Sequence, residues 1–284
     1  MNRIWAAVMA SLASSTASAA KSDPRAAIPT FSVPFELDHG HIFIGVSVNG
    51  RGPYRFGFDT GASGVGRVDA SLTSELRLPS DGTAETNDGI RTASADEVAV
   101  QDLRVGMLDR HDVTVLSRDY NGGRKTGMKP IQGIIARDFF ADVLVTINYP
   151  ARTITFSEGS LADAPGAIPY GASLSIPVCF SKSCYPAKID TGSSRSIVIP
   201  KDLAAKVAAT TPVAIGQGAR MNGVSQLFEM QLLEPVRVGN VTATGQKVLF
   251  TVPSDDSINV GSDFLKDYVL TIDQRHHLLR IARP

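Results

Sequence analysis

Residues 56–63 read FGFDTGAS, and residues 187–194 read AKIDTGSS. In both stretches a strand-like run ends in Asp-Thr-Gly followed by small residues, and the two motifs are 131 residues apart. One Asp-Thr-Gly tripeptide alone is weak evidence, because aspartate and glycine are common in turns. Two copies at the ends of similar strands indicate that the chain repeats a structural unit.

Further segments of the two halves repeat as well. Residues 134–140 read IIARDFF and residues 259–265 read NVGSDFL, an offset of 125. Between motif and segment, NDGI at residues 87–90 is echoed by MNGV at residues 221–224. Three elements in the same order and at similar offsets predict two copies of one folding unit.

These motifs resemble those of the aspartic peptidases, and their residues are most similar to those of bacterial retropepsin-like or pepsin-like members. The resemblance covers residues 30–284. It implies a mainly β, bilobal fold in which two similar lobes surround a central cleft and each lobe supplies one catalytic aspartate. By motif match these are Asp59 and Asp190. A single chain that carries both halves resembles the two-lobed pepsin arrangement, so we expect a monomer.

The chemistry explains why the motif comes in pairs. Two carboxylates held about 3 Å apart cannot both ionise, so they share one proton, and one acts as a base while the other acts as an acid. A water molecule between Asp59 and Asp190 would lose its proton while attacking a peptide carbonyl. The resemblance therefore predicts an aspartic-type endopeptidase, a hydrolase that acts on peptide or protein substrates without a cofactor or a metal.

The other motif residues are expected to support the two loops. The family gives the threonine hydroxyls a bonding role across the loops, glycine lets two backbones approach closely, and the serines are placed to hydrogen-bond the carboxylates. These supporting residues are Thr60, Gly61, Ser63, Thr191, Gly192 and Ser194. Alanine follows the first motif, as in retropepsins, and serine follows the second, as in pepsins, so we expect an intermediate pH optimum.

Three patterns outline the domains. Residues 1–19 combine a positive start, a short apolar run and a small-x-small site, which predicts a secretory signal peptide and a periplasmic or secreted protein. The N-terminal β lobe is expected over residues 30–158 and the C-terminal β lobe over residues 172–284. Residues 159–171, rich in Gly, Ala and Pro, are expected to link them.

The composition is that of a soluble globular protein. Of 284 residues 43% are hydrophobic, and 28 basic residues balance 28 acidic ones. Without a basic run, neither nucleic acid nor an anionic membrane is an expected partner. His39 and His41 could lie on one face of a strand, but two histidines without a third ligand make a poor metal site.

Local patterns add strands and helices. Residues 42–48 and 54–58 predict a hairpin that delivers Asp59, and residues 174–178 and 185–189 predict the equivalent hairpin for Asp190. Short helices are expected over residues 69–76 and 200–207, and an edge or interlobe strand over residues 31–35, where Pro34 favours an edge.

The two cysteines, Cys179 and Cys184, flank the turn of the second hairpin. In an oxidising compartment this spacing is most simply a disulfide that stiffens the strand leading to Asp190. Free thiols are the alternative, because the hairpin register must also bring the two side chains within reach.

Two features depart from the family pattern. The predicted flap hairpin, with candidates Asn87, Asp88 and Gly89, has no tyrosine near its tip. Ala136 stands where the family has glycine, which the second half keeps as Gly261. If that position needs a positive φ, alanine is strained there, and if it needs only a close approach, alanine nearly suffices.

Two questions stay open at the level of sequence. Arg67 and Arg195 follow the motifs closely enough to contact a substrate or a carboxylate, although a solvated or structural arginine is the commoner case. The alternative to an endopeptidase is a non-catalytic secreted peptide-binding protein of the same fold, since fold does not dictate function.

Overall fold

The fold is known from a computed structural model. It describes residues 28–87, 92–122, 129–220, 223–254 and 256–284. These residues are mainly in β-strands and their helices are short, so the predicted fold class is confirmed. The predicted signal peptide, residues 1–19, and the flap candidates Asp88 and Gly89 lie outside the described residues.

The first lobe is built on an eight-stranded sheet. Its strands, in spatial order, are β2 (Glu36–Asp38), β3 (His41–Val48), β4 (Arg51–Phe58), β9 (Gly133–Ile135), β5 (Gly66–Asp69), β8 (Leu108–Arg118), β7 (Thr92–Val105) and β6 (Ser80–Asn87). Strand β9 runs parallel to β4 and antiparallel to β5, and β5 runs parallel to β8. The predicted hairpin that leads to Asp59 is the pair β3–β4.

The second lobe repeats this plan in a nine-stranded sheet. Its strands, in spatial order, are β16 (Val213–Arg220), β17 (Gly223–Gln231), β20 (Lys247–Val252), β15 (Ile197–Val198), β21 (Ile258–Val260), β14 (Ser183–Ile189), β13 (Ser175–Phe180), β18 (Val236–Val238) and β19 (Val241–Ala243). From the hairpin β13–β14 onward, the strands follow the same order and directions as in the first lobe. The sequence repeat is therefore also a repeat of strand topology.

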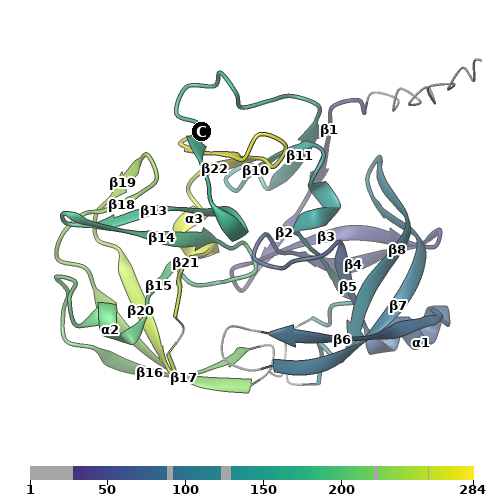
Figure 1. Cartoon of the computed structure of the whole chain (residues 1–284), viewed down its shortest axis with the longest axis horizontal. Helices are drawn as coiled ribbons and strands as arrows, with labels where there is room; N and C mark the ends of the chain where they lie inside the picture. The colour runs from purple at the N-terminus through teal and green to yellow at the C-terminus, as the bar shows by residue number, and fades with distance from the viewer. Residues whose placement is uncertain (1–27, 88–91, 123–128, 221–222, 255) are drawn as a thin grey trace, which may run out of the picture.

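A six-stranded antiparallel sheet joins the two halves, at the top of Figure 1. Its strands, in spatial order, are β1 (Phe31–Pro34), β11 (Thr153–Ser157), β10 (Leu144–Asn148), β22 (Val269–Asp273), β23 (Leu278–Ala282) and β12 (Ile168–Pro169). Strand β1 lies at an edge, where Pro34 needs no hydrogen-bond donor, as expected. At the centre of the sheet Thr146 faces Thr271, and these residues occupy equivalent positions in the two halves.

Short helices lie between the strands of the sheets. They are α1 (Ala70–Leu76), η1 (Arg137–Phe140), η2 (Ala172–Leu174), α2 (Lys201–Ala204) and α3 (Ser262–Leu265). Asp69 caps α1 by accepting a hydrogen bond from the backbone N–H of Ser71. Helix α2 was predicted to extend to Val207 but ends at Ala204, and the N–H groups of Lys206 and Val207 both donate to the carbonyl of Leu203 in the turn that follows.

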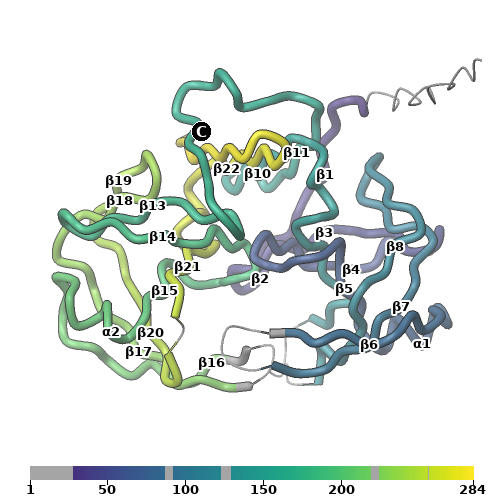
Figure 2. Tube along the Cα trace, viewed as in Figure 1, coloured from purple at the N-terminus to yellow at the C-terminus, as the bar shows by residue number. Residues whose placement is uncertain are grey.

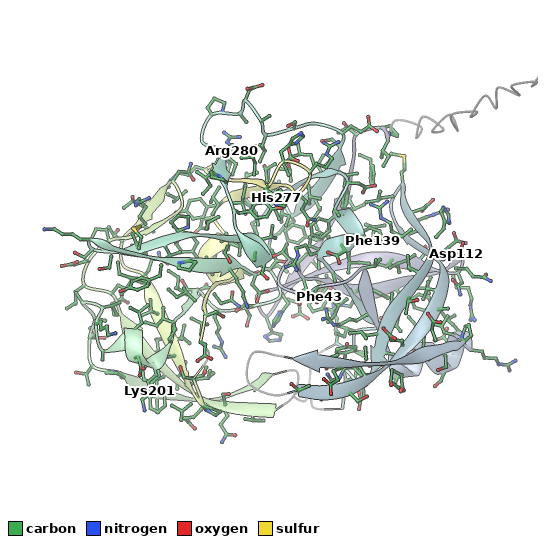
Figure 3. The ribbon with its side chains drawn as sticks, in the orientation of Figure 1. Phe43, Asp112, Phe139, Lys201, His277 and Arg280 are labelled. Carbon is green, nitrogen blue, oxygen red and sulfur yellow. A yellow bond between two sulfur atoms is a disulfide. The ribbon has the colours of Figure 1, made fainter. Side chains whose placement is uncertain are left out.

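The core of the first lobe holds the strand that leads to Asp59. Phe56 and Phe58 of β4 alternate into the core, and Phe58 stacks on Phe140 with ring centroids 5.0 Å apart. Phe139, labelled in Figure 3, is also fully buried. Because the stacked ring of Phe140 fixes Phe58 at the end of β4, the position of Asp59 is set by packing as well as by the sheet.

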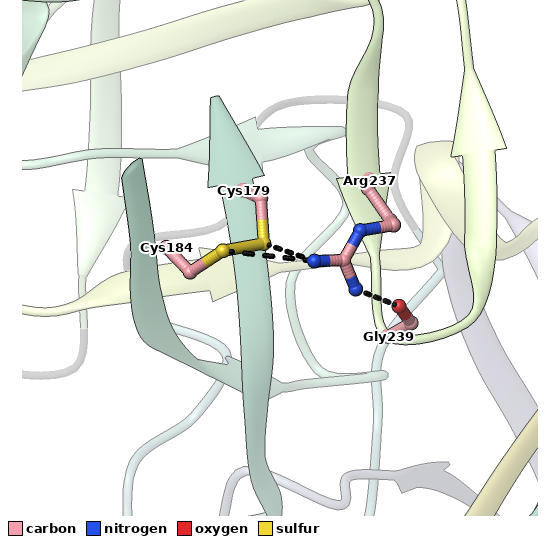
Figure 4. The surroundings of a disulfide bond; sticks show 4 residues. All are labelled: Cys179, Cys184, Arg237 and Gly239. Atoms are coloured by element: carbon pink, nitrogen blue, oxygen red, sulfur yellow. Dashed lines mark hydrogen bonds between the residues drawn. A yellow bond between two sulfur atoms is a disulfide. The ribbon is translucent and has the colours of Figure 1, made fainter. Parts of the chain in front are cut away.

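Cys179 and Cys184 form a disulfide, as predicted, and they face each other directly across the hairpin β13–β14. Arg237 lies beside the two sulfur atoms and also donates a hydrogen bond to the carbonyl of Gly239 (Figure 4). A disulfide is typical of an oxidising compartment. In the described part of the chain, no helix has the length and the apolar character needed to cross a bilayer.

Each lobe also carries a long hairpin next to its central strands. These are β6–β7 in the first lobe and β16–β17 in the second, and Figure 2 shows both on the side of the molecule opposite the six-stranded sheet. Asn87, the described flap candidate, is the last residue of β6 and pairs with Thr92 of β7. The hairpin predicted around residue 87 is present.

Candidate active site

The two Asp-Thr-Gly loops follow equivalent strands. Asp59 comes directly after β4 and Asp190 directly after β14. The backbone N–H of Asp59 donates to the carbonyl of Ile135 at 3.0 Å, and that of Asp190 donates to the carbonyl of Val260 at 2.9 Å. Both aspartates therefore start their loops from the same point of the repeated sheet.

The threonines of the two motifs lock the loops together. The backbone N–H of Thr60 donates to the hydroxyl oxygen of Thr191, and the N–H of Thr191 donates to that of Thr60. Each hydroxyl then donates to a carbonyl of the opposite strand, Thr60 to Ile189 at 2.9 Å and Thr191 to Phe58 at 2.7 Å. Both threonines are fully buried, so water does not compete for these bonds.

Backbone amides donate hydrogen bonds to the Oδ1 atom of each carboxylate. Asp59 Oδ1 accepts hydrogen bonds from the N–H groups of Gly61 and Ala62, at 2.8 and 3.0 Å. Asp190 Oδ1 accepts one from the N–H of Gly192 at 2.9 Å. Amide donors of this kind fix the orientation of a carboxylate without adding a charge.

Glycine is required in both loops by close approach. A Cβ atom on Gly61 would lie 2.5 Å from Cγ of Asp190, and one on Gly192 would lie 2.3 Å from Cγ of Asp59. Each carboxylate is thus packed against the loop of the other lobe. The structure brings the two predicted aspartates together in one site.

The surroundings of Asp59, including the neighbouring Asp190, change the pKa of Asp59. The pKa of Asp59 is raised to about 7, first by burial, then by the charge of Asp190 and by a hydrogen bond to the Asp190 side chain. The nearby charge of Arg67 acts in the opposite direction. A carboxyl that retains its proton beside an ionised one is the state that general acid–base catalysis by two aspartates requires.

Asn259 is a site residue that the sequence analysis missed. Its side-chain nitrogen donates to Asp190 Oδ2 at 2.6 Å. The equivalent residue of the first lobe is Ile134, so the two aspartates have different surroundings. The sequence signal that could have identified it is the polar Asn259 at a strand position where the other half has the apolar Ile134.

The predicted hydrogen bonds from Ser63 and Ser194 to the carboxylates are absent from the described part of the chain. Ser63 is exposed and Ser194 is partly buried. The loop amides instead donate to Oδ1 of both aspartates, and Asn259 donates to Oδ2 of Asp190.

Ala136 and Gly261 occupy equivalent positions in extended backbone, with φ of −107° and −109°. Neither residue has a positive φ. The position therefore requires a small residue because another part of the chain approaches it closely, and not because of its backbone conformation. A Cβ atom on Gly261 would lie 2.5 Å from the carbonyl oxygens of both Ser193 and Arg195. In the first lobe, where Ala62 replaces Ser193, an alanine methyl is accommodated at full burial.

Carbonyls behind the two loops are satisfied by different side chains. Arg137 donates to the carbonyl of Thr60, and Ser262 donates to that of Thr191. Tyr149 shares a second hydrogen bond with the Ser262 hydroxyl at 2.9 Å. Among the described residues no group of three or more His, Cys, Asp or Glu side chains is arranged to hold a metal ion.

Comparisons with known proteins agree with this site. Residues 44–139 match the family model of aspartyl proteases. The fold is similar to that of the aspartic proteinase from Irpex lacteus, with a TM-score of 0.59, 14% identity, and coverage of 90% of this chain and 97% of that one. No curated protein matches the chain. The family model thus matches the part of the chain that contains Asp59, and the fold of the chain is similar to that of an aspartic proteinase.

Proposed function

We propose that this protein is an aspartic endopeptidase. The observation that carries the proposal is the pair Asp59 and Asp190, each of which packs against the loop of the other lobe while it is oriented by the amides of its own loop. The aspartyl protease family match over residues 44–139 supports the same reaction class. Because one chain supplies both aspartates, we propose that it acts as a monomer.

The proposed mechanism uses the single proton of the pair. A water molecule bound between the two carboxyls transfers a proton to the ionised aspartate while its oxygen attacks the carbonyl carbon of the scissile peptide bond. The protonated aspartate transfers its proton to the carbonyl oxygen, which becomes one hydroxyl of a tetrahedral diol. The aspartate that took the proton from water then gives it to the leaving nitrogen, while the other aspartate takes a proton from a diol hydroxyl. The C–N bond breaks, an amine and a carboxylic acid leave, and the pair again holds one proton.

The asymmetry of the site bears on which aspartate holds the proton. Asn259 donates a hydrogen bond to Asp190 Oδ2, whereas the equivalent residue beside Asp59 is the apolar Ile134. The pKa of Asp59 is raised, so Asp59 holds the proton in the resting pair. In this proposal Asp190 acts first as the base and Asp59 as the acid.

The substrate is proposed to be an extended peptide bound between the lobes. An extended chain exposes backbone donors and acceptors that pair with the edge of a hairpin such as β6–β7. We further propose that residues 1–19 direct export, with which the disulfide is compatible.

The test is cleavage of a mixed peptide library from pH 3 to 7 by the purified chain without residues 1–19, alongside Asp59→Asn and Asp190→Asn. We expect the wild type to cleave and each variant to lose activity by about a thousandfold or more, since either change removes one partner of the acid–base pair. Unchanged unfolding temperatures would show that the variants are folded. A folded wild type that binds library peptides and cleaves none would favour the peptide-binding alternative.

A further inference from the structure

Arg67 breaks the symmetry of the two lobes next to the candidate active site. It lies on β5, between Leu116 of β8 and Ile134 of β9. The same position of the second lobe is Val198, which pairs with Asn259. A charged residue thus occupies, in one lobe only, a position where the other lobe has an apolar side chain.

The guanidinium of Arg67 is buried without being satisfied. The residue is only 6% exposed, and neither Nε nor Nη1 has a hydrogen-bond partner among the described residues. A buried donor without a partner costs about 1–3 kcal/mol, and more when it is charged. A native structure that retains such a group calls for a partner that binds there.

The nearest carboxylate on the same strand is already occupied. Asp69 lies two residues beyond Arg67 on β5 and therefore on the same face. Its Oδ1 accepts hydrogen bonds from the backbone and hydroxyl of Ser71, and its Oδ2 accepts one from the backbone N–H of Tyr120. Asp69 is used to cap α1 and to hold the following loop, and neither of its oxygens accepts a hydrogen bond from Nε or Nη1 of Arg67.

Two further observations place the open donors beside the dyad. In the second lobe Val198 pairs with Asn259, which reaches Asp190, so the equivalent pair of Arg67 and Ile134 lies beside Asp59, and the charge of Arg67 correspondingly lowers the pKa of Asp59. The hydroxyl of Tyr120 is also buried without a hydrogen-bond partner among the described residues, and the charges of Arg67 and Asp59 both act on its pKa. Arg67 and Tyr120 therefore offer unused donors in the neighbourhood of one member of the pair.

We propose that Arg67 and the Tyr120 hydroxyl form a substrate subsite that binds the carboxylate of a glutamate or aspartate side chain close to the scissile bond. This inference rests on the proposed function and specifies its substrate class. An ionised carboxylate accepts the charge-assisted hydrogen bonds that a guanidinium offers, and a tyrosine hydroxyl adds a neutral donor. The negative charge of the substrate also compensates for the buried positive charge.

The preference for an acidic substrate residue is expected on one side of the scissile bond only. The second lobe has Val198 at the equivalent position, and valine offers a carboxylate no donor. A subsite lined by an apolar side chain disfavours a desolvated carboxylate. The chain should therefore select an acidic residue at one position of the peptide and tolerate apolar residues at the symmetric one.

The test uses a set of fluorophore-labelled octapeptides of fixed apolar composition, each with one glutamate at one of the eight positions, and the matched set with glutamine. Affinities are measured by fluorescence anisotropy with the double variant D59N/D190N, which binds without cleaving. Rates of cleavage are measured separately with the wild type. We expect glutamate to be favoured about tenfold or more over glutamine at one position, the size typical of hydrogen bonds to a charged group.

Variants assign the preference to residues. Arg67→Met keeps the length of the side chain without its charge and should bring the glutamate-to-glutamine ratio close to 1, while Tyr120→Phe should reduce it a fewfold. Arg67→Lys, which retains the charge, should keep part of the preference. Arg51→Met is the matched control, because Arg51 is exposed and pairs with Glu75 away from this region, and it should leave the ratio unchanged.

The outcomes separate this inference from the proposed function. Absence of cleavage by the wild type contradicts the endopeptidase, while the anisotropy ratios still decide the role of Arg67. Equal affinities for glutamate and glutamine peptides at every position, a preference that survives Arg67→Met, or no binding of any peptide overturns the subsite. The comparison of glutamate and glutamine peptides uses a protein that retains Arg67. It can therefore overturn the subsite even if Arg67→Met does not fold.

Discussion

Thr60 and Thr191 each donate a backbone N–H to the other's hydroxyl oxygen, at 3.1 and 3.0 Å. The two Asp-Thr-Gly loops are thereby joined in a closed pair of hydrogen bonds at a point where both residues are fully buried. The separation of the two carboxyl groups depends on this junction, so changes in it should affect stability and activity together.

Thr60→Val should destabilise the protein and reduce its activity. Valine has a similar shape but leaves the N–H of Thr191 and the carbonyl of Ile189 without a partner. Each unsatisfied buried group costs about 1–3 kcal/mol. Urea unfolding measures the loss, and Thr60→Ser, which keeps the hydroxyl, is the control. Equal stability of the valine variant and the wild type would show that the junction is dispensable.

Stability should fall as the pH rises towards neutrality because of Asp59. Its pKa is raised in the folded state from 3.8 to about 7, so the carboxyl keeps its proton there while the unfolded chain releases it. The stability that this group contributes is complete below about pH 4 and is lost as the pH rises through about 7. Thermal unfolding across this range should show a steeper decline for the wild type than for Asp59→Asn. Parallel curves would contradict the raised pKa.

Activity should decline above about pH 7 for the same reason. Once Asp59 loses its proton, the pair has no acid to polarise the substrate carbonyl. Arg67 lowers the pKa of Asp59, so Arg67→Met should move the alkaline limb of kcat/KM to higher pH. The measurement is a pH–rate profile with a glutamine-containing peptide, which removes the effect of substrate charge. An alkaline limb that stays in place would show that the charge of Arg67 does not reach the pair.

Asn259→Ile should reduce kcat more than it raises KM. Isoleucine is the residue that the first lobe has at this position, and it removes the donor to Asp190 Oδ2. Loss of one hydrogen bond to a charged group amounts to about 1.5–3 kcal/mol, or roughly tenfold or more in rate. Steady-state kinetics on one peptide measure the effect, and Asn240→Ile, at an exposed position, is the control. A change confined to KM would instead assign Asn259 to substrate binding.

Gly261→Ala should be far less tolerated than Ala136→Gly, although the positions are equivalent. The added methyl would meet two carbonyl oxygens at 2.5 Å, and overpacking of this kind typically costs about 1–3 kcal/mol. Removing the methyl of Ala136 in extended backbone should cost about 0.5–1 kcal/mol. Unfolding free energies of the two variants provide the comparison, and similar losses would mean that the second loop relaxes around the methyl.

The parts of this fold that could be predicted from the sequence are those carried by adjacent residues. The motif around Asp59 predicted its strand, its hairpin and its repetition, and the spacing of Cys179 and Cys184 predicted a disulfide. The pairing of β10 with β22 joins residues from the two halves and leaves no local signal. Asn259 was missed because its one local signal, a polar residue where the other half has Ile134, does not show that Asp190, 69 residues away, lies beside it.

The six-stranded sheet has one further consequence. Where β10 meets β22, Thr146 faces Thr271, and Leu144 faces Asp273 while Asn148 faces Val269, so each half presents the same stretch to the other about a two-fold axis. This isologous contact is what two identical subunits form in a symmetric dimer. The chain therefore has the geometry of a homodimer whose subunits are fused covalently. Fusion frees each former subunit to mutate independently, which is how one half can hold Arg67 while the other holds Asn259.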